Sequence, residues 1–124
     1  MADKTEKIMY FATHADDDPE KAAMPFVMAS AALAMDMEAV VVLQGQGVYL
    51  ARQGYADNVL TGGGFPPMRK LLDDFMALGG DLRVCVPCIK ARNIDESELV
   101  EGSKTTAAGA LNVEAVEADA VFVY

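Results

Sequence analysis

The sequence predicts an α/β protein: a three-layer α/β/α sandwich built on a five-stranded parallel sheet. Short apolar runs rich in β-branched residues alternate with helical patterns along the chain, which is typical of βαβ units. One run, residues 39–43 (AVVVL), is continuously apolar, as expected of a strand buried on both faces of a parallel sheet. The length of 124 residues leaves room for one core, and we predict a single domain over residues 1–124.

The first elements are a strand, a polar loop and a long helix. Residues 7–12 (KIMYFA) form an apolar run and predict the first strand, and residues 13–18 (THADDD) form the loop after it. The aspartates at the end of this loop can cap a helix that we predict over residues 19–35, with Pro19 in its first turn. This helix is apolar around almost its whole circumference, which predicts burial on more than one side.

The remaining elements repeat the same alternation of strand and helix. A helical stretch over residues 48–53 follows the second strand, and glycines and prolines mark residues 62–67 as a loop. An amphipathic helix is expected over residues 68–78, where a glycine pair ends it. The later elements are a strand at 81–86, a helical segment at 87–92, a turn at 95–101, a weak strand at 103–108, a helix at 109–119 and a strand at 120–124.

Composition and charge exclude several classes of function. The chain carries 19 acidic and 10 basic residues, a net charge of -9, which argues against binding to nucleic acid or to an anionic membrane surface. Its longest stretch without a charge, residues 22–35, is shorter than the roughly 20 residues of a membrane-spanning helix. The N-terminus shows no pattern of a signal peptide, so we expect a cytoplasmic protein with reduced cysteines.

The two cysteines, Cys85 and Cys88, are the strongest chemical signal in the sequence. They lie where the third strand passes into a helical turn, and a helix N-terminus favours the reactive thiolate. Lys90 and Arg92 add positive charge and are candidate anion-binding residues. A nucleophilic or sulfur-carrying Cys85 and a small, buried, inert Cys85 are both consistent with this pattern.

Two familiar cysteine sites do not fit. The C-V-P-C spacing is that of a thioredoxin-type dithiol, but that motif follows an early strand, whereas here it begins at residue 85. A structural zinc site usually takes four ligands, and the two cysteines with the single histidine supply at most three. We therefore predict neither a metal nor another cofactor.

Two other loops are expected at the same edge of the sheet, because the carboxyl ends of parallel strands meet there. His14, after the first strand, is a candidate proton donor or thiolate partner, or else an exposed loop residue. Gly45 and Gly47, after the second strand, can cradle an anion or can simply permit a tight turn. The full glycine fingerprint of a dinucleotide site is absent, because Leu50 holds its third position.

Three segments resemble the DsrE/DsrF-like family, which includes sulfur-relay proteins: residues 17–35, 40–52 and 82–102, with the ending AVFVY also similar. The resemblance implies a five-stranded parallel α/β/α domain and assembly into trimers or hexamers. It also implies a persulfide on Cys85, with Arg92 matching a basic residue of the motif. The leading hypothesis is therefore a sulfur-relay protein, a possible sulfurtransferase, in which Cys85 accepts sulfane sulfur and Cys88 can resolve it.

Two alternatives from other classes remain open. One is a non-catalytic oligomeric module that binds a small ligand or a partner, and the other is a thiol-redox sensor that uses Cys85 and Cys88. A sulfur relay would need donor and acceptor proteins. A homo-oligomer is expected in any of these cases, because a chain of this length has too few elements to cover both sides of the apolar helix at residues 19–35.

Overall fold

Five strands form one parallel sheet in the order β4-β3-β2-β1-β5. This computed structural model describes residues 5–124, so the first four residues of the predicted domain lie outside it. The strands are β1 (Lys7–Ala12), β2 (Glu38–Leu43), β3 (Asp81–Cys85), β4 (Lys104–Thr106) and β5 (Ala120–Val123).

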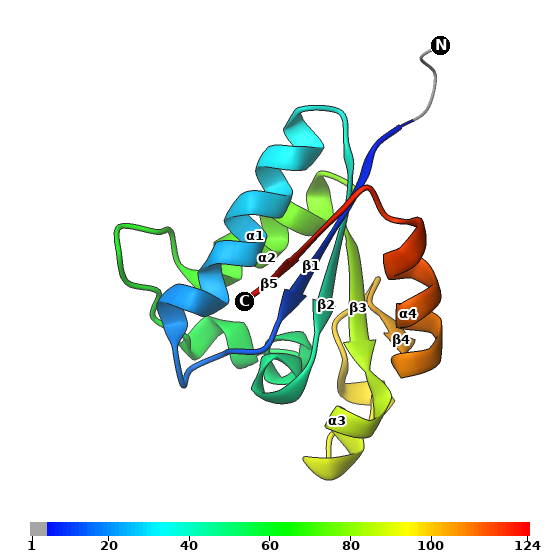
Figure 1. Cartoon of the computed structure of the whole chain (residues 1–124). Helices are drawn as coiled ribbons and strands as arrows, with labels where there is room; N and C mark the ends of the chain where they lie inside the picture. Colours follow the sequence, from blue (N-terminus) through cyan, green and yellow to red (C-terminus); the bar gives the residue numbers. More distant parts are fainter. Residues whose placement is uncertain (1–4) are drawn as a thin grey trace.

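Helices cover both faces of the sheet, which makes three layers (Figure 1). The helices α1 and α2 pack on one face, and α4 packs on the other. The predicted fold class is therefore confirmed. The helices are α1 (Pro19–Ala34), α2 (Met68–Ala77), α3 (Val86–Ala91) and α4 (Ala108–Glu117), and the 3₁₀ turns are η1 (Gly45–Ala51), η2 (Tyr55–Asn58) and η3 (Glu96–Glu98).

The core has two parts, because successive side chains of a strand point to opposite faces. Tyr10 and Val41 belong to the larger part, under α1 and α2. Met9 and Val40 belong to the smaller part, where Leu111 is the buried side chain of α4. The β2 strand is buried from Ala39 to Leu43, as its continuous apolar run predicts.

The structure differs from the prediction mainly after β2. The expected helical stretch at residues 48–53 is a 3₁₀ helix that begins earlier, at Gly45, and ends at Ala51. Gly45 adopts a positive φ of 54° and Gly47 N–H donates to Gln44 O at 2.9 Å, so the turn tightens directly after the strand. The η2 turn was not predicted, because its sequence YADN has no periodic apolar pattern.

Apolar side chains remain exposed along β5 and beside it. Val121, Phe122 and Val123 are 42%, 40% and 72% exposed, and Met28 on α1 is 40% exposed. Tyr10 connects the two elements, because its ring stacks on Phe122 and its hydroxyl donates to Met28 O at 3.5 Å. We call these four exposed residues the β5 surface. Within residues 5–124, no helix is both long and apolar enough to cross a membrane.

Candidate functional site

The two cysteines lie at the carboxyl edge of the sheet, where β3 ends and α3 begins (Figure 1). Cys85 is the last residue of β3 and the N-cap of α3, and Pro87 lies in the first turn of that helix, where its missing N–H has no cost. Both cysteines are free thiols. Their sulfur atoms are 3.0 Å apart, so the two thiols are in direct contact.

The two sulfurs differ in exposure. Cys85 is 8% exposed and packs in the core, whereas Cys88 is only partly buried. Burial is the largest cause that raises the pKa of Cys85, and the neighbouring Cys88 thiol raises it further. The Cys88 backbone amide and the charge of Arg92 oppose this rise without cancelling it. The first turn of α3 therefore lowers the pKa of Cys85, as its place at a helix N-terminus predicts, but burial outweighs this effect and the net shift is upward.

Gly45 is the residue that the fold brings to Cys88. Its backbone N–H donates to Cys88 Sγ at 3.3 Å, which stabilises negative charge on this sulfur. The contact arises because β2 and β3 are adjacent parallel strands, so the turn after one meets the helix after the other. The sequence predicts an anion cradle or a tight turn at this glycine, but it does not specify the strand order that pairs the glycine with Cys88.

Gly47 has a packing role. A Cβ built on it would lie 2.3 Å from Ala12 O, so only glycine lets η1 approach the end of β1 this closely. Its N–H is already engaged with Gln44 O at 2.9 Å.

The two basic residues at the end of α3, Lys90 and its C-cap Arg92, lie in different environments. Arg92 Nη1 donates to Cys88 O at 3.1 Å, and its guanidinium lies 5.9 Å from the centre of the Tyr49 ring. Lys90 is exposed and forms no ion pair with any side chain of residues 5–124. Of the two, Arg92 is thus the one held beside the cysteines.

Two stacked tyrosines, which the sequence did not predict as part of the site, lie next to Arg92. Tyr49 stacks on Tyr55 with ring centres 5.1 Å apart, and Tyr55 Oη donates to Asp16 Oδ1 at 2.7 Å. Burial, together with this carboxylate, raises the pKa of Tyr55 to about 12, and the same hydrogen bond lowers the pKa of Asp16. We call Tyr49, Tyr55 and Asp16 the tyrosine rim; it joins the loop after β1 to η1 and η2.

His14 lies in the loop after β1 and is held by a neighbour. Its Nδ1 is 2.8 Å from Asp17 Oδ2, and Asp17 Oδ1 accepts from Ala15 N–H at 2.7 Å. None of the hydrogen bonds found within residues 5–124 joins His14 to either cysteine. Over the same residues, no three His, Cys, Asp or Glu side chains gather in a group that could hold a metal ion.

The arrangement can perform thiol chemistry. One accessible sulfur with an amide donor lies next to a second, buried sulfur, so a group bound to the first is within reach of the second. Exchange between sulfur atoms needs a thiolate, a leaving thiol and access, and requires no cofactor.

Relatives of this chain exist in archaea. It is 32% identical over 98 residues to uncharacterized protein MJ0989 of Methanocaldococcus jannaschii, covering 79% of this chain and 82% of that protein. It is 31% identical over 99 residues to uncharacterized protein MJ0760 of the same organism, covering 80% of this chain but only 36% of that protein.

Solved structures share the fold. The crystal structure of the ychN protein from E. coli superposes with a TM-score of 0.80 at 19% identity, covering 97% of this chain and all of that one. The protein of unknown function MTH1491 from Methanobacterium thermoautotrophicum gives a TM-score of 0.76 at 15% identity, covering 96% and 99%. The sequence profile of the DsrE/DsrF-like family, which is linked to sulfur relay, matches residues 6–124. The chain therefore belongs to the DsrE/DsrF-like family.

Proposed function

We propose that this protein carries sulfane sulfur on the Cys85–Cys88 pair and exchanges it with donor and acceptor proteins. The observation that carries the proposal is the 3.0 Å separation of two unlinked thiols at the carboxyl edge of the sheet. Membership of a family linked to sulfur relay supports it. We place the protein in the cytoplasm, where thiols of this kind stay reduced.

In the first step, sulfur enters at Cys88, because its sulfur is the more accessible and accepts the Gly45 N–H at 3.3 Å. The Cys88 thiolate attacks the outer sulfur of a donor persulfide, R–S–SH. A new sulfur–sulfur bond forms at Cys88, the donor's sulfur–sulfur bond breaks, and the donor leaves as the thiolate R–S⁻. No net oxidation or reduction occurs.

In the second step, Cys85 takes the sulfur and holds it. Cys85 gives up its proton and attacks as the thiolate on the outer sulfur of the Cys88 persulfide; the bond between that sulfur and Cys88 breaks, a Cys85 persulfide forms, and the departing Cys88 sulfur takes up the proton. Because Cys85 is 8% exposed, the carried sulfur is shielded there from small thiols in solution. If Cys85 attacks the inner sulfur instead, the products are a Cys85–Cys88 disulfide and hydrogen sulfide, and the cargo is lost.

The same sulfur contact favours one alternative, a thiol-redox sensor. An oxidant that accepts two electrons and two protons from the thiol pair would leave a disulfide, and 3.0 Å requires only a small approach to the ~2.05 Å of that bond. The other alternative, a ligand-binding module, needs neither thiol. The sulfur carrier requires a persulfide on the cysteines, the redox sensor requires a reversible disulfide between them, and the ligand-binding module requires neither.

Intact mass after incubation with a persulfide donor tests the proposal. We expect wild type to gain one sulfur atom that mild reduction removes. Cys85→Ser should load only transiently at Cys88, and Cys88→Ser should load more slowly, because the accessible entry point is gone. A reversible disulfide without sulfur gain would support the redox sensor. Equal behaviour of wild type and the Cys85→Ser, Cys88→Ser double variant would support the ligand-binding module.

A further inference from the structure

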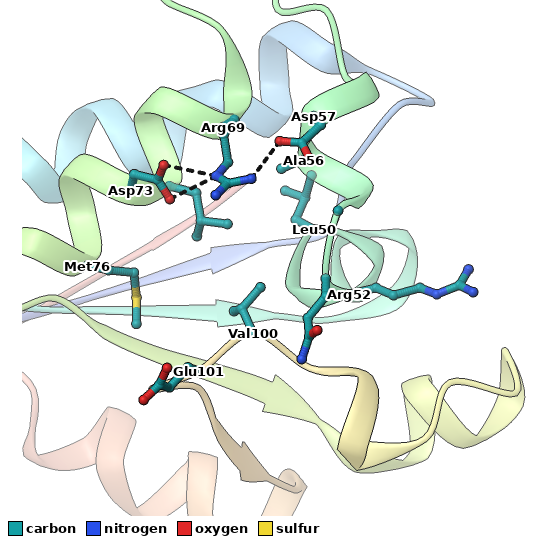
Figure 2. A pocket seen from close by; sticks show the side chains of 12 residues that line it. Leu50, Arg52, Ala56, Asp57, Arg69, Asp73, Met76, Val100 and Glu101 are labelled. Atoms are coloured by element: carbon teal, nitrogen blue, oxygen red, sulfur yellow. Dashed lines mark hydrogen bonds and ion pairs between the residues drawn. The ribbon is translucent and has the colours of Figure 1, made fainter.

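A cavity of about 490 Å³ lies between α2, the η1–η2 region and residues 100–101 (Figure 2). Neither cysteine lines it, nor do Arg92 and His14, so it is separate from the sulfur site. Its volume is within the range of roughly 300–1,000 Å³ that is typical of sites for small molecules. Nothing in the proposed sulfur chemistry uses it.

The cavity has an apolar floor. Leu50 and Leu72 are buried beneath it, whereas Met76 and Val100 are only partly buried and offer apolar surface to an occupant. Met76 comes from α2 and Val100 from the segment after η3, so the floor joins two elements distant in sequence (Figure 2). A floor of this kind favours an organic body over a fully hydrated inorganic ion.

The charges around the floor leave a surplus of carboxylates. Arg69 is held on one side of the cavity: its Nη1 donates to Asp57 at 2.7 Å and its Nε to Asp73 at 2.9 Å. Arg52 points away from the floor in Figure 2 and pairs with Glu98 at 3.1 Å. Each lining cation therefore already has a carboxylate partner.

Glu101, an exposed side chain, is the lining carboxylate that forms no ion pair with any cation of residues 5–124. It lies below Val100 in Figure 2, on the side of the cavity away from Arg69 and Asp73. Among the ion pairs of residues 5–124, none includes Glu101. An anionic ligand would meet this free carboxylate and two guanidinium groups that are already paired, whereas a cationic ligand would neutralise it.

We propose that this cavity binds a small organic ammonium ion, with its cationic nitrogen beside Glu101 and its apolar body over Met76 and Val100. The apolar floor supplies the contact area, and Glu101 selects the sign of the charge. The proposal is independent of the cysteines and adds a ligand site to the proposed sulfur carrier.

Titration of the isotope-labelled protein, followed by backbone amide chemical shifts, tests the site. The probes are phenylethylammonium, the uncharged phenylethanol and the anionic phenylpropionate, compared at about 150 mM salt to screen distant charges. We expect phenylethylammonium to shift the amides of the lining residues and to bind about three- to five-fold more tightly than phenylethanol, as one exposed ion pair allows. Phenylpropionate should bind most weakly.

A pair of matched variants separates the cavity from general attraction to an acidic protein. Glu101→Gln should reduce phenylethylammonium binding to the level of phenylethanol. Glu117→Gln, an equal charge change at an exposed position of α4, should have no effect. The proposal is overturned if phenylethanol binds as tightly as the cation, if phenylpropionate binds most tightly, or if Glu117→Gln weakens binding as much as Glu101→Gln.

Discussion

At the scale of single residues, the cysteine pair has an accessible member and a buried one. Cys88 accepts the Gly45 N–H, whereas the pKa of Cys85 is raised by burial. We therefore expect iodoacetamide near neutral pH to alkylate Cys88 before Cys85, the reverse of the order that the helix N-terminus alone predicts. Labelling of Cys85 should increase only at pH values above the usual pKa of a thiol, because burial raises the pKa of Cys85. Mass mapping of the labelled peptides over a pH series measures both.

The Gly45 amide can be tested with a pair of glycine variants within the same experiment. Gly45 and Gly54 both have positive φ, 54° and 83°, and neither lacks space for a methyl group. Alanine should cost about 1–2 kcal/mol of stability at either position. Relief of the positive φ at Gly45 would turn its N–H away from Cys88 Sγ, whereas Gly54 has no contact with Cys88, so we expect only Gly45→Ala to slow alkylation of Cys88. Equal rates in the two variants would contradict the role of the amide.

The candidate site was predictable only in part. The C-V-P-C motif and the strand that ends in it identify Cys85 and Cys88 directly, and Gly45 follows from the tight turn after a buried strand. The pairing of Gly45 with Cys88 depends on β2 lying next to β3, which no local pattern specifies. The tyrosine rim is formed by contacts between three separate segments, so a sequence motif could not reveal it.

At the scale of elements, α4 is attached to the sheet by an ion-pair network as well as by an apolar contact. Leu111 is its buried apolar residue, whereas Glu114 accepts a hydrogen bond from Arg83 on β3 and pairs with Lys7 on β1 at 3.3 Å. The Arg83 hydrogen bond holds the pKa of Glu114 below its usual value. The ionised Glu114 carboxylate therefore stabilises the folded protein fully at pH values above its unfolded pKa of about 4.3. This stabilisation is lost as the pH falls through the lower pKa that Glu114 has in the folded protein.

Glu114→Gln should therefore destabilise the protein by about 1–2 kcal/mol at neutral pH. The variant should also lose less stability than wild type when the pH is lowered, because it lacks the Glu114 carboxyl that takes up a proton in acid. Urea unfolding at neutral pH and near pH 3 measures both effects. Glu117→Gln on the same helix is the control, and an equal loss of stability there would show that net charge is responsible.

Most elements were predictable because each depends on a local pattern. The continuous run AVVVL specifies β2, and an amphipathic pattern specifies α2. Short elements were harder to predict. The strand β4 is only Lys104–Thr106, and it is a strand because it pairs with β3 and not because its sequence favours one. The strand order itself arises from packing of the whole chain and has no local signature.

At the scale of the whole molecule, the β5 surface is an apolar surface that a monomer leaves exposed to solvent. Apolar side chains lie there on both faces of an edge strand, with Phe122 on the α1 face and Val121 and Val123 on the α4 face, and exposed apolar edges usually mark interfaces. We propose that copies of this chain associate through it into a closed homo-oligomer, a trimer or a hexamer. The outer side of α1 contributes Met28, so the helix that prompted the prediction forms only part of this surface.

Sedimentation at micromolar concentration should show an oligomer for wild type. Val123→Lys should shift it toward monomer, because Val123 is 72% exposed and a charge buried at an interface without a partner is unfavourable. Leu60→Lys is the matched control, since Leu60 is 87% exposed in a loop distant in sequence from β5. A monomeric wild type, or equal dissociation in both variants, would contradict the proposed interface.

The group that holds the accessible sulfur is a main-chain N–H, and the turn that carries it is fixed by the close approach of Gly47 to Ala12 O. The tyrosine rim does not supply this N–H, so we expect that its side chains can change while the N–H stays beside Cys88. A protein built in this way can keep one chemistry while its choice of partner diverges. If the chain carries sulfur as proposed, exchanging rim residues between relatives should redirect its delivery and leave the rate of the sulfur step unchanged.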